Sequence, residues 1–160
     1  MNDIPLGVLL GVGIPVFVLL VGGTIAYLVI SAVQKATART RAELEREGVI
    51  MDTGRTWVTI RLNGFRGYGV AVGVGVYKER GAFVLSKQRL VLVPSRRRFP
   101  QLSHADLAQF DVSADGGQLV LHTDHPPNAT GTMDVRVTVS DPNAWVKALT
   151  EAGAKPANLR

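Results

Sequence analysis

The histidines are the side chains of this chain that are best suited to acid–base or metal chemistry near neutral pH. There are three of them, His104, His122 and His125. If His122 ends a strand, Asp124 shares its face of that strand and His125 follows at once. A cluster of two or three ligands in a proline-containing loop is weak evidence for a metal site. The sequence therefore predicts no bound metal.

Nucleophilic chemistry and phosphate binding have little support either. The chain has no cysteine, which excludes disulfides, thiolate metal sites and a cysteine nucleophile, and which suits a reducing cytoplasm. No serine lies in a nucleophile-elbow motif. Gly67 and Gly69 would need a third glycine at position 72 to form a dinucleotide loop, and Val72 stands there. We therefore expect no enzyme activity and no cofactor.

Basic residues are the more informative group, because they are unevenly spread. Residues 55–98 carry a net charge of +9, whereas residues 99–160 carry −3. A basic face would be attracted to anionic lipid or to nucleic acid. Nucleic acid is the less favoured of the two, because stacking aromatics are few. The alternative is a solvated surface with its charges scattered around a closed sheet. The candidate lipid or partner contacts are Arg61, Arg66, Arg89, Arg96, Arg97 and Arg98.

The N-terminal segment predicts a membrane anchor over residues 1–33. Residues 4–34 contain no Lys, Arg, Asp or Glu, and about 20 apolar residues suffice to cross a bilayer. A cleaved signal peptide would have a basic start and a shorter apolar core, but here Asp3 and no Lys or Arg precedes the apolar stretch. The basic flank after the span predicts that the N-terminus lies outside and the C-terminal domain in the cytoplasm, at the cell membrane.

The helical region contains a candidate assembly motif and a linker. Gly7 and Gly11 form a Gly-x-x-x-Gly pair, which can let two membrane helices pack closely. They are candidate helix–helix contacts, although glycine is common in membrane helices anyway. Residues 34–50 read as a helical juxtamembrane linker that ends at Gly48.

The region 51–154 reads as one domain that is mainly β, because its apolar residues recur with a period of two. The predicted strands are Thr56–Leu62, Gly67–Tyr77, Ala82–Ser86, Arg89–Pro94, Leu107–Val112, Gln118–Thr123 and Thr132–Val139. Turns are expected at Asn63-Gly64, at Lys87-Gln88 and at Asp115-Gly116-Gly117.

The second predicted strand alternates valine with glycine or alanine. Tyr68, Val70, Val72, Val74 and Val76 are expected on one face and the small residues on the other. Glycines in a strand permit strong coiling or the close approach of another backbone. The small-residue face therefore indicates either a strongly coiled strand or a flat surface for a partner.

A single helix is expected to follow the last strand. Asp141 suits the N-cap and Pro142 the first helical position. Trp145 and Leu149 lie four residues apart and predict the buried stripe, and Gly153 is expected to end the helix. Residues 155–160 read as a tail.

About seven antiparallel strands followed by one Trp-bearing helix resemble the pleckstrin-homology-like (PH-like) superfold. The stretch Gly81–Pro94, with Ser86 before Arg89-Leu90, is similar to the hairpin of bacterial PH-like and GRAM-like domains, and Asp141–Trp145 to the start of their helix. The resemblance implies a bent sheet or barrel closed by the C-terminal helix. The phosphoinositide-binding subset has lysines in the first hairpin. This chain offers Arg61 and Arg66 there, which argues against specific inositol-lipid recognition.

The whole layout resembles small bacterial single-span membrane proteins with a PH-like domain. We therefore expect a membrane-anchored, non-enzymatic interaction module that binds membrane lipids or a protein partner through its basic face. The alternative is an accessory subunit of a larger membrane complex, assembled through the spanning helix, which could also support a homo-oligomer.

Overall fold

The computed structural model describes the backbone of residues 6–94 and 99–157, and the side chains within those ranges from residue 21 onward. The chain forms two compact units, residues 1–38 and residues 39–160. Gly7, Gly11, Arg96, Arg97 and Arg98, which the sequence singled out as contacts, lie outside the described side chains.

A helix of 42 residues, α1 (Leu6–Glu47), begins in the first unit and ends in the second. Gly48, with a φ of +84°, follows its last residue, which confirms the predicted end of the linker helix. Among the helices whose side chains are described, none is both long enough and apolar enough to cross a membrane. The span predicted over residues 1–33 lies mostly in the part of α1 whose side chains the structure leaves undescribed.

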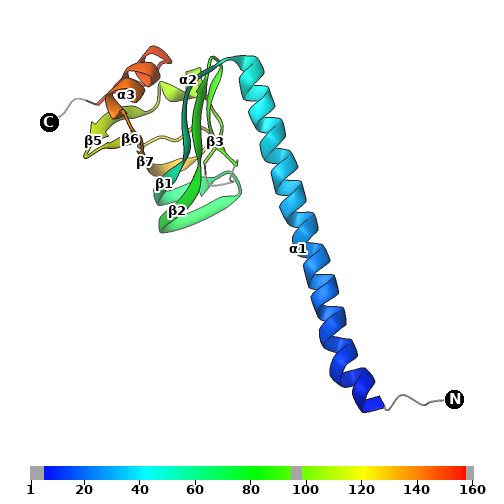
Figure 1. Ribbon diagram of the computed structural model, residues 1–160. Helices are drawn as coiled ribbons and strands as arrows, with labels where there is room; N and C mark the ends of the chain where they lie inside the picture. The colour runs from blue at the N-terminus through cyan, green and yellow to red at the C-terminus, as the bar shows by residue number, and fades with distance from the viewer. Residues whose placement is uncertain (1–5, 95–98, 158–160) are drawn as a thin grey trace. The chain divides into compact units, whose positions relative to one another are not determined.

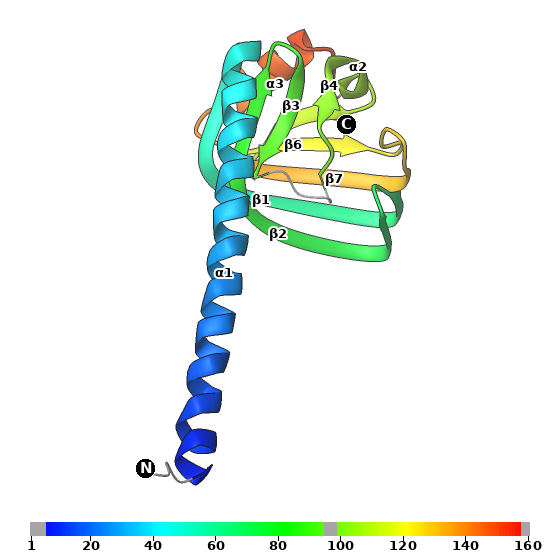
Figure 2. The same ribbon diagram turned by 90° about the vertical axis from the view of Figure 1, so that its right-hand side faces the viewer.

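The second unit contains one curled, half-barrel sheet of eight strands in the order β4-β3-β2-β1-β7-β6-β5-β8 (Figures 1 and 2). The prediction of a mainly β domain is confirmed. The strands are β1 (Val49–Gly67), β2 (Val70–Ser86), β3 (Arg89–Val93), β4 (Leu102–Ser103), β5 (Asp111–Asp115), β6 (Gln118–Thr123), β7 (Thr130–Thr138) and β8 (Lys155–Pro156). The two further helices are α2 (His104–Leu107) and α3 (Pro142–Glu151).

The first hairpin is longer than the sequence predicted. Asn63 and Gly64 do not form its turn but lie within β1, and the chain reverses after Gly67. Gly64 has a φ of +58°, and the register between β1 and β7 shifts beyond Asn63. An Asn-Gly pair supplies the positive φ that a bulge as well as a turn requires. Here it makes the irregularity and leaves the strand intact.

This irregularity also changes which side chains face inward. Leu62 and Phe65 are both buried although they are three residues apart. The valines of β2 change sides at the same level. Val70 and Val72 are half-buried, whereas Val74 is 81% exposed and Val76 59% exposed. The predicted single valine face is therefore wrong. The side chain of Tyr77 lies across Gly75, where an added Cβ would come within 2.9 Å of it.

Two further corrections concern the second half of the sheet. Residues predicted to begin a strand at Leu107 instead end α2, which starts with a capping box between Ser103 and Asp106. The following strand, β5, runs to Asp115. Lys155, predicted to begin a tail, pairs through β8 with Asp111 of β5.

Two of the predicted turns and the C-terminal helix are confirmed, whereas the strands predicted over residues 67–77 and 82–86 are one strand, β2. The turns at Lys87-Gln88 and Asp115-Gly116-Gly117 connect paired strands. Asp141 caps α3 by accepting a hydrogen bond from the backbone N–H of Ala144 at 3.0 Å. Trp145 and Leu149 are buried in the main core, where α3 packs against β5 and β6. The inner side of the sheet faces this core, and the outer side faces away from it.

Candidate functional site

The end of α1 packs on the outer side of β2 and β3. Leu44 is buried there in a small apolar cluster of its own. The cluster consists of Leu44, Ala82, Val84, Val91 and Val93. Along β2 these positions alternate with Phe83 and Leu85, which belong to the main core. The last turns of α1 are thus part of the folded domain, which the sequence had begun only at residue 51.

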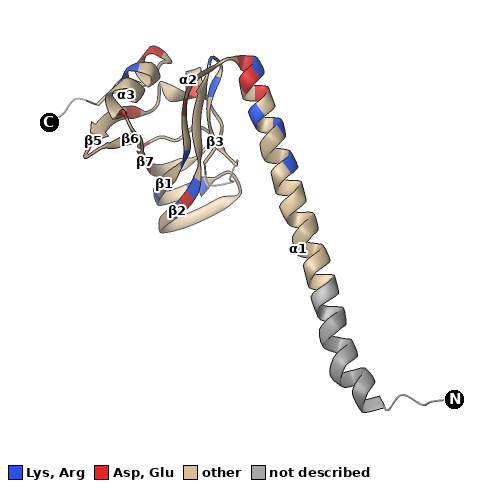
Figure 3. Cartoon of the chain, in the orientation of Figure 1, with Lys and Arg blue, Asp and Glu red and all other residues tan. Residues whose placement is uncertain are grey.

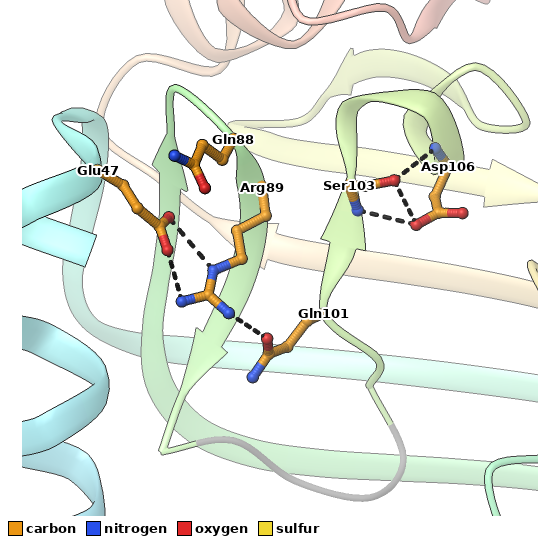
Figure 4. A pocket seen from close by; sticks show the side chains of 6 residues that line it. All are labelled: Glu47, Gln88, Arg89, Gln101, Ser103 and Asp106. Carbon is orange, nitrogen blue, oxygen red and sulfur yellow. Dashed lines mark hydrogen bonds and ion pairs between the residues drawn. The ribbon is translucent and has the colours of Figure 1, made fainter. Parts of the chain in front are cut away.

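Polar contacts hold the same helix end in place (Figure 4). The guanidinium of Arg89 lies 2.6 Å from a carboxylate oxygen of Glu47 and 3.3 Å from one of Glu43. It also donates a hydrogen bond to the side-chain oxygen of Gln101. The buried hydroxyl of Ser86 donates to Glu47 at 2.7 Å. Arg89, predicted as a lipid or partner contact, is therefore engaged within the chain.

These residues line a polar depression of about 390 Å³. Its lining residues are Glu47, Gln88, Arg89, Gln101, Ser103 and Asp106 (Figure 4). Ser103 and Asp106 bond to each other in the capping box, at 2.7 Å between the hydroxyl and the carboxylate. Arg89 is paired with Glu47, and the carboxylate of Asp106 accepts from Ser103, so the charged groups of the depression already have partners within the chain. This arrangement supports a structural junction better than a binding site.

A different surface lies on the outer side of β1 and β2, next to the strip that Leu44 covers. Trp57 is 55% exposed there, and the guanidinium of Arg80 lies 5.4 Å from the centre of its ring. Lys78 stands opposite Thr59, and Arg61 stands opposite the exposed Val76. We call Trp57, Arg61, Lys78 and Arg80 the basic–aromatic face. The charged residues of the molecule are coloured in Figure 3.

The outer side of β5, β6 and β7 has the opposite character. Asp111, Asp115 and Asp134 stand on it. The guanidinium of Arg136 lies 3.3 Å from carboxylate oxygens of both Asp115 and Asp134. A shallow groove of about 350 Å³ runs between the two regions. It is lined by Trp57, Thr59, Lys78, Gln118, Arg136 and Thr138. The outer side thus changes from basic at β1–β2 to acidic at β5–β7.

The structure brings together only part of the predicted set. Arg61 is exposed within the basic–aromatic face, whereas Arg66 is exposed near the far end of the first hairpin, beside a depression of about 470 Å³. Trp57 and Arg80 were not predicted as contacts. Their signal was available, because Trp57 alternates with the apolar residues of its strand and must point away from the core.

The histidines do not converge on one site. His122 lies with its Nε2 3.3 Å from Asp124 and its Nδ1 4.0 Å from Asp134, while the Nε2 of His104 contacts the carbonyl of Ser86 at 3.2 Å. His125 is exposed. Over the described ranges, no group of three or more His, Cys, Asp or Glu side chains is arranged to hold a metal ion.

Tyr68 is the one described group whose titration departs clearly from its usual range. Its ring stacks on Phe65 with the centroids 6.0 Å apart, and its hydroxyl donates to the carbonyl of Pro127. Burial, and to a lesser extent the negative charge of Asp106, raise the pKa of Tyr68. A raised phenol pKa keeps the side chain neutral, so it gives no activated base near neutral pH.

The basic–aromatic face is therefore the described surface best suited to a ligand, since it combines exposed cations with an exposed indole. It offers attraction to negative charge and an amphipathic ring. No protein-family model matches the sequence, and no curated protein matches it either.

Proposed function

We propose that this protein is a membrane-anchored, non-enzymatic interaction module whose basic–aromatic face docks on anionic lipid. In this proposal residues 1–33 span the cell membrane with the N-terminus outside, and the sheet domain lies at the cytoplasmic surface. The uncharged stretch of residues 4–34 and the basic residues that follow it support this topology. The lipid would then be that of the leaflet next to the domain.

The observation that carries the proposal is the presence of Trp57 beside Arg80 on an open sheet surface. Tryptophan favours the lipid headgroup region, because its ring is apolar and its N–H can still find a partner there. Each Lys or Arg near an anionic leaflet contributes about 1 kcal/mol. Arg61, Lys78 and Arg80 together would contribute about 3 kcal/mol by the same rule. This is modest, but an anchored domain needs no more because its local concentration is high.

We further propose that the domain has a PH-like fold. The curled sheet, followed after β7 by the Trp-bearing helix α3, supports this assignment. In the proposal, α3 closes one end of the curled sheet. Because one fold hosts many functions, the lipid-docking proposal stands on the residues of the basic–aromatic face alone.

The test uses the full chain reconstituted in lipid nanodiscs that contain brominated lipid. Bromine quenches tryptophan fluorescence at short range. Of the two tryptophans of the chain, Trp145 is buried and Trp57 exposed. We expect strong quenching in discs with anionic lipid and little in zwitterionic discs. This extra quenching with anionic lipid, the anionic increment, should be lost in the Trp57→Phe variant. Equal quenching in both lipids would overturn the proposal.

Charge reversal provides a second measurement on the same sample. Replacing Lys78 and Arg80 with Glu should abolish the anionic increment, because two attractive charges become repulsive. The matched control is Lys147→Glu, a reversal at an exposed position on α3. If the anionic increment survives replacement of Lys78 and Arg80 but falls in Lys147→Glu, docking occurs through another surface.

A further inference from the structure

The outer side of β2 carries an ordered line of side chains. Four alternate residues of this strand are exposed, whereas the residues between them are half-buried. The four are Val74, Val76, Lys78 and Arg80. Alternate residues of a strand point to the same side of the sheet. The line therefore consists of two exposed valines followed by two exposed cations.

A bend in β2 makes the first of these valines project. A Cβ built on Gly75 would lie 2.8 Å from the Cγ1 atom of Val72, although residues three apart in a straight strand are about 10 Å apart. The strand is therefore bent here, with Val72 and the open side of Gly75 within the bend. Val74 points the opposite way from its neighbour Gly75, so it stands on the convex side, where it is 81% exposed.

The same stretch lies at a free edge of the sheet. β3 pairs only with Ala82–Leu85 of β2, so β1 is the only described strand that pairs with Val70–Val76. Figure 2 shows this part of β2 as the lowest strand of the sheet. No described strand therefore comes between the projecting valines and a flat surface that approaches this edge.

We propose that this edge of β2 enters the anionic leaflet, with Val74 and Val76 below the lipid phosphates and Lys78 and Arg80 at their level. The inference rests on the proposed lipid docking and adds which strand enters the lipid and how deeply. Apolar side chains gain free energy by leaving water for the hydrocarbon boundary. The long stems of Lys and Arg let their charges stay at the phosphates while the strand lies deeper.

Charge favours a lipid leaflet over an apolar protein surface as the occupant. The valines stand among cations of the basic–aromatic face, since Arg61 is the Cα partner of Val76 and Lys78 follows two residues later. An apolar protein pocket would bury these cations without partners, whereas a leaflet places phosphates directly above an apolar layer. The acidic outer side of β5–β7 lies beyond β1 in the sheet order. The same phosphates repel it, which turns the β2 edge toward the lipid.

The absence of native cysteine allows a fluorophore to be attached at one position of the full-length chain. A nitrobenzoxadiazole label on Val74→Cys emits more brightly and at shorter wavelength when it enters an apolar layer. We expect this change in nanodiscs with anionic lipid and not in zwitterionic discs. The matched control is Asn143→Cys, an exposed and uncharged position on α3. Its label should remain in water in both kinds of disc.

Replacement of both valines by serine tests the same step without a label. The readout is the quenching of Trp57 by brominated anionic lipid. Because insertion removes two valines from water, Val74→Ser combined with Val76→Ser should lower the ratio of docked to undocked domain by about tenfold. The matched control is Val49→Ser combined with Ile50→Ser, two exposed apolar residues at the start of β1. It should leave the quenching unchanged.

The two measurements separate failure of the insertion from failure of the docking. If Trp57 keeps its anionic increment while the label at position 74 stays in water, the domain docks without inserting β2, and only the present inference is overturned. If the parent chain shows no anionic increment at Trp57, the docking proposal fails and the insertion fails with it. Equal label shifts in both kinds of disc or at both labelled positions overturn the insertion, and so does quenching that the serine replacements leave intact.

Discussion

At the scale of single residues, Arg89 shows how the environment decides what a charged side chain does. The sequence places it in a basic run, but the fold surrounds it with Glu47, Glu43 and Gln101. Its side chain is 22% exposed and that of Glu47 is 13% exposed. An ion pair in such a position is less screened by solvent than a surface pair.

We predict that Arg89→Ala lowers the free energy of unfolding by about 1–3 kcal/mol, because it leaves the carboxylate of Glu47 with fewer partners in a mostly buried position. Urea denaturation followed by circular dichroism would measure the change. Arg61→Ala removes a guanidinium at an exposed position and should change stability by no more than about 0.5 kcal/mol. Equal effects of the two substitutions would mean that the Arg89 contacts add no stability.

At the scale of elements, the bulged region of β1 depends on a close backbone approach by β7. Gly131 has a φ of +86°, and a Cβ built on it would lie 2.4 Å from the carbonyl oxygens of Asn63 and Gly64. Backbone atoms cannot yield as a flexible side chain can. The positive φ alone disfavours any L-residue with a Cβ.

Gly131→Ala should therefore destabilise the domain by about 2–4 kcal/mol, the sum of left-handed strain and a backbone clash. The matched control is Gly116→Ala, where φ is also positive, at +54°, but nothing lies within 4 Å of the added carbon. It should cost about 1 kcal/mol, from strain alone. Thermal unfolding of both variants compares strain plus clash with strain alone. Similar losses of stability would contradict the clash at position 131.

Elements with one uninterrupted period were predictable from the sequence. β7 alternates without a break from Met133 to Val137, and α3 has its cap, its proline and its apolar stripe in order. The first hairpin was not predictable in detail, because Asn63-Gly64 fits a turn and a bulge equally and only pairing with β7 decides between them. α2 was missed because four residues are too few to show a helical period.

At the scale of the whole second unit, the uneven charge of the sequence becomes an uneven charge of one surface. The basic half of the chain forms β1, β2 and β3, and the acidic half forms β5, β6 and β7. Because the sheet order separates these two groups of strands, their outward charges stay apart. The sequence could predict the imbalance but not its placement. That placement follows from β7 pairing with β1, a contact between distant segments that no local pattern encodes.

The boundary of the second unit leads to the last prediction, since the unit begins at residue 39 and includes the end of α1. A fragment of residues 39–160 keeps Leu44 over Ala82 and Val84, and keeps Glu47 beside Arg89. A fragment of residues 48–160 retains all of β1 but uncovers this apolar strip and leaves Arg89 without its closest carboxylate. We expect the shorter fragment to be less stable by about 3–5 kcal/mol, from lost apolar burial and a broken ion pair.

Urea unfolding of the two fragments measures this difference, and Leu44→Ala within residues 39–160 apportions it. The substitution should account for about 2–3 kcal/mol, because a buried leucine is truncated while the ion pairs are kept. If residues 48–160 unfold at the same urea concentration as residues 39–160, the helix end contributes nothing to the domain. A loss matched by Leu44→Ala alone would assign the junction to apolar packing and reduce Arg89 and Glu47 to a role in orientation.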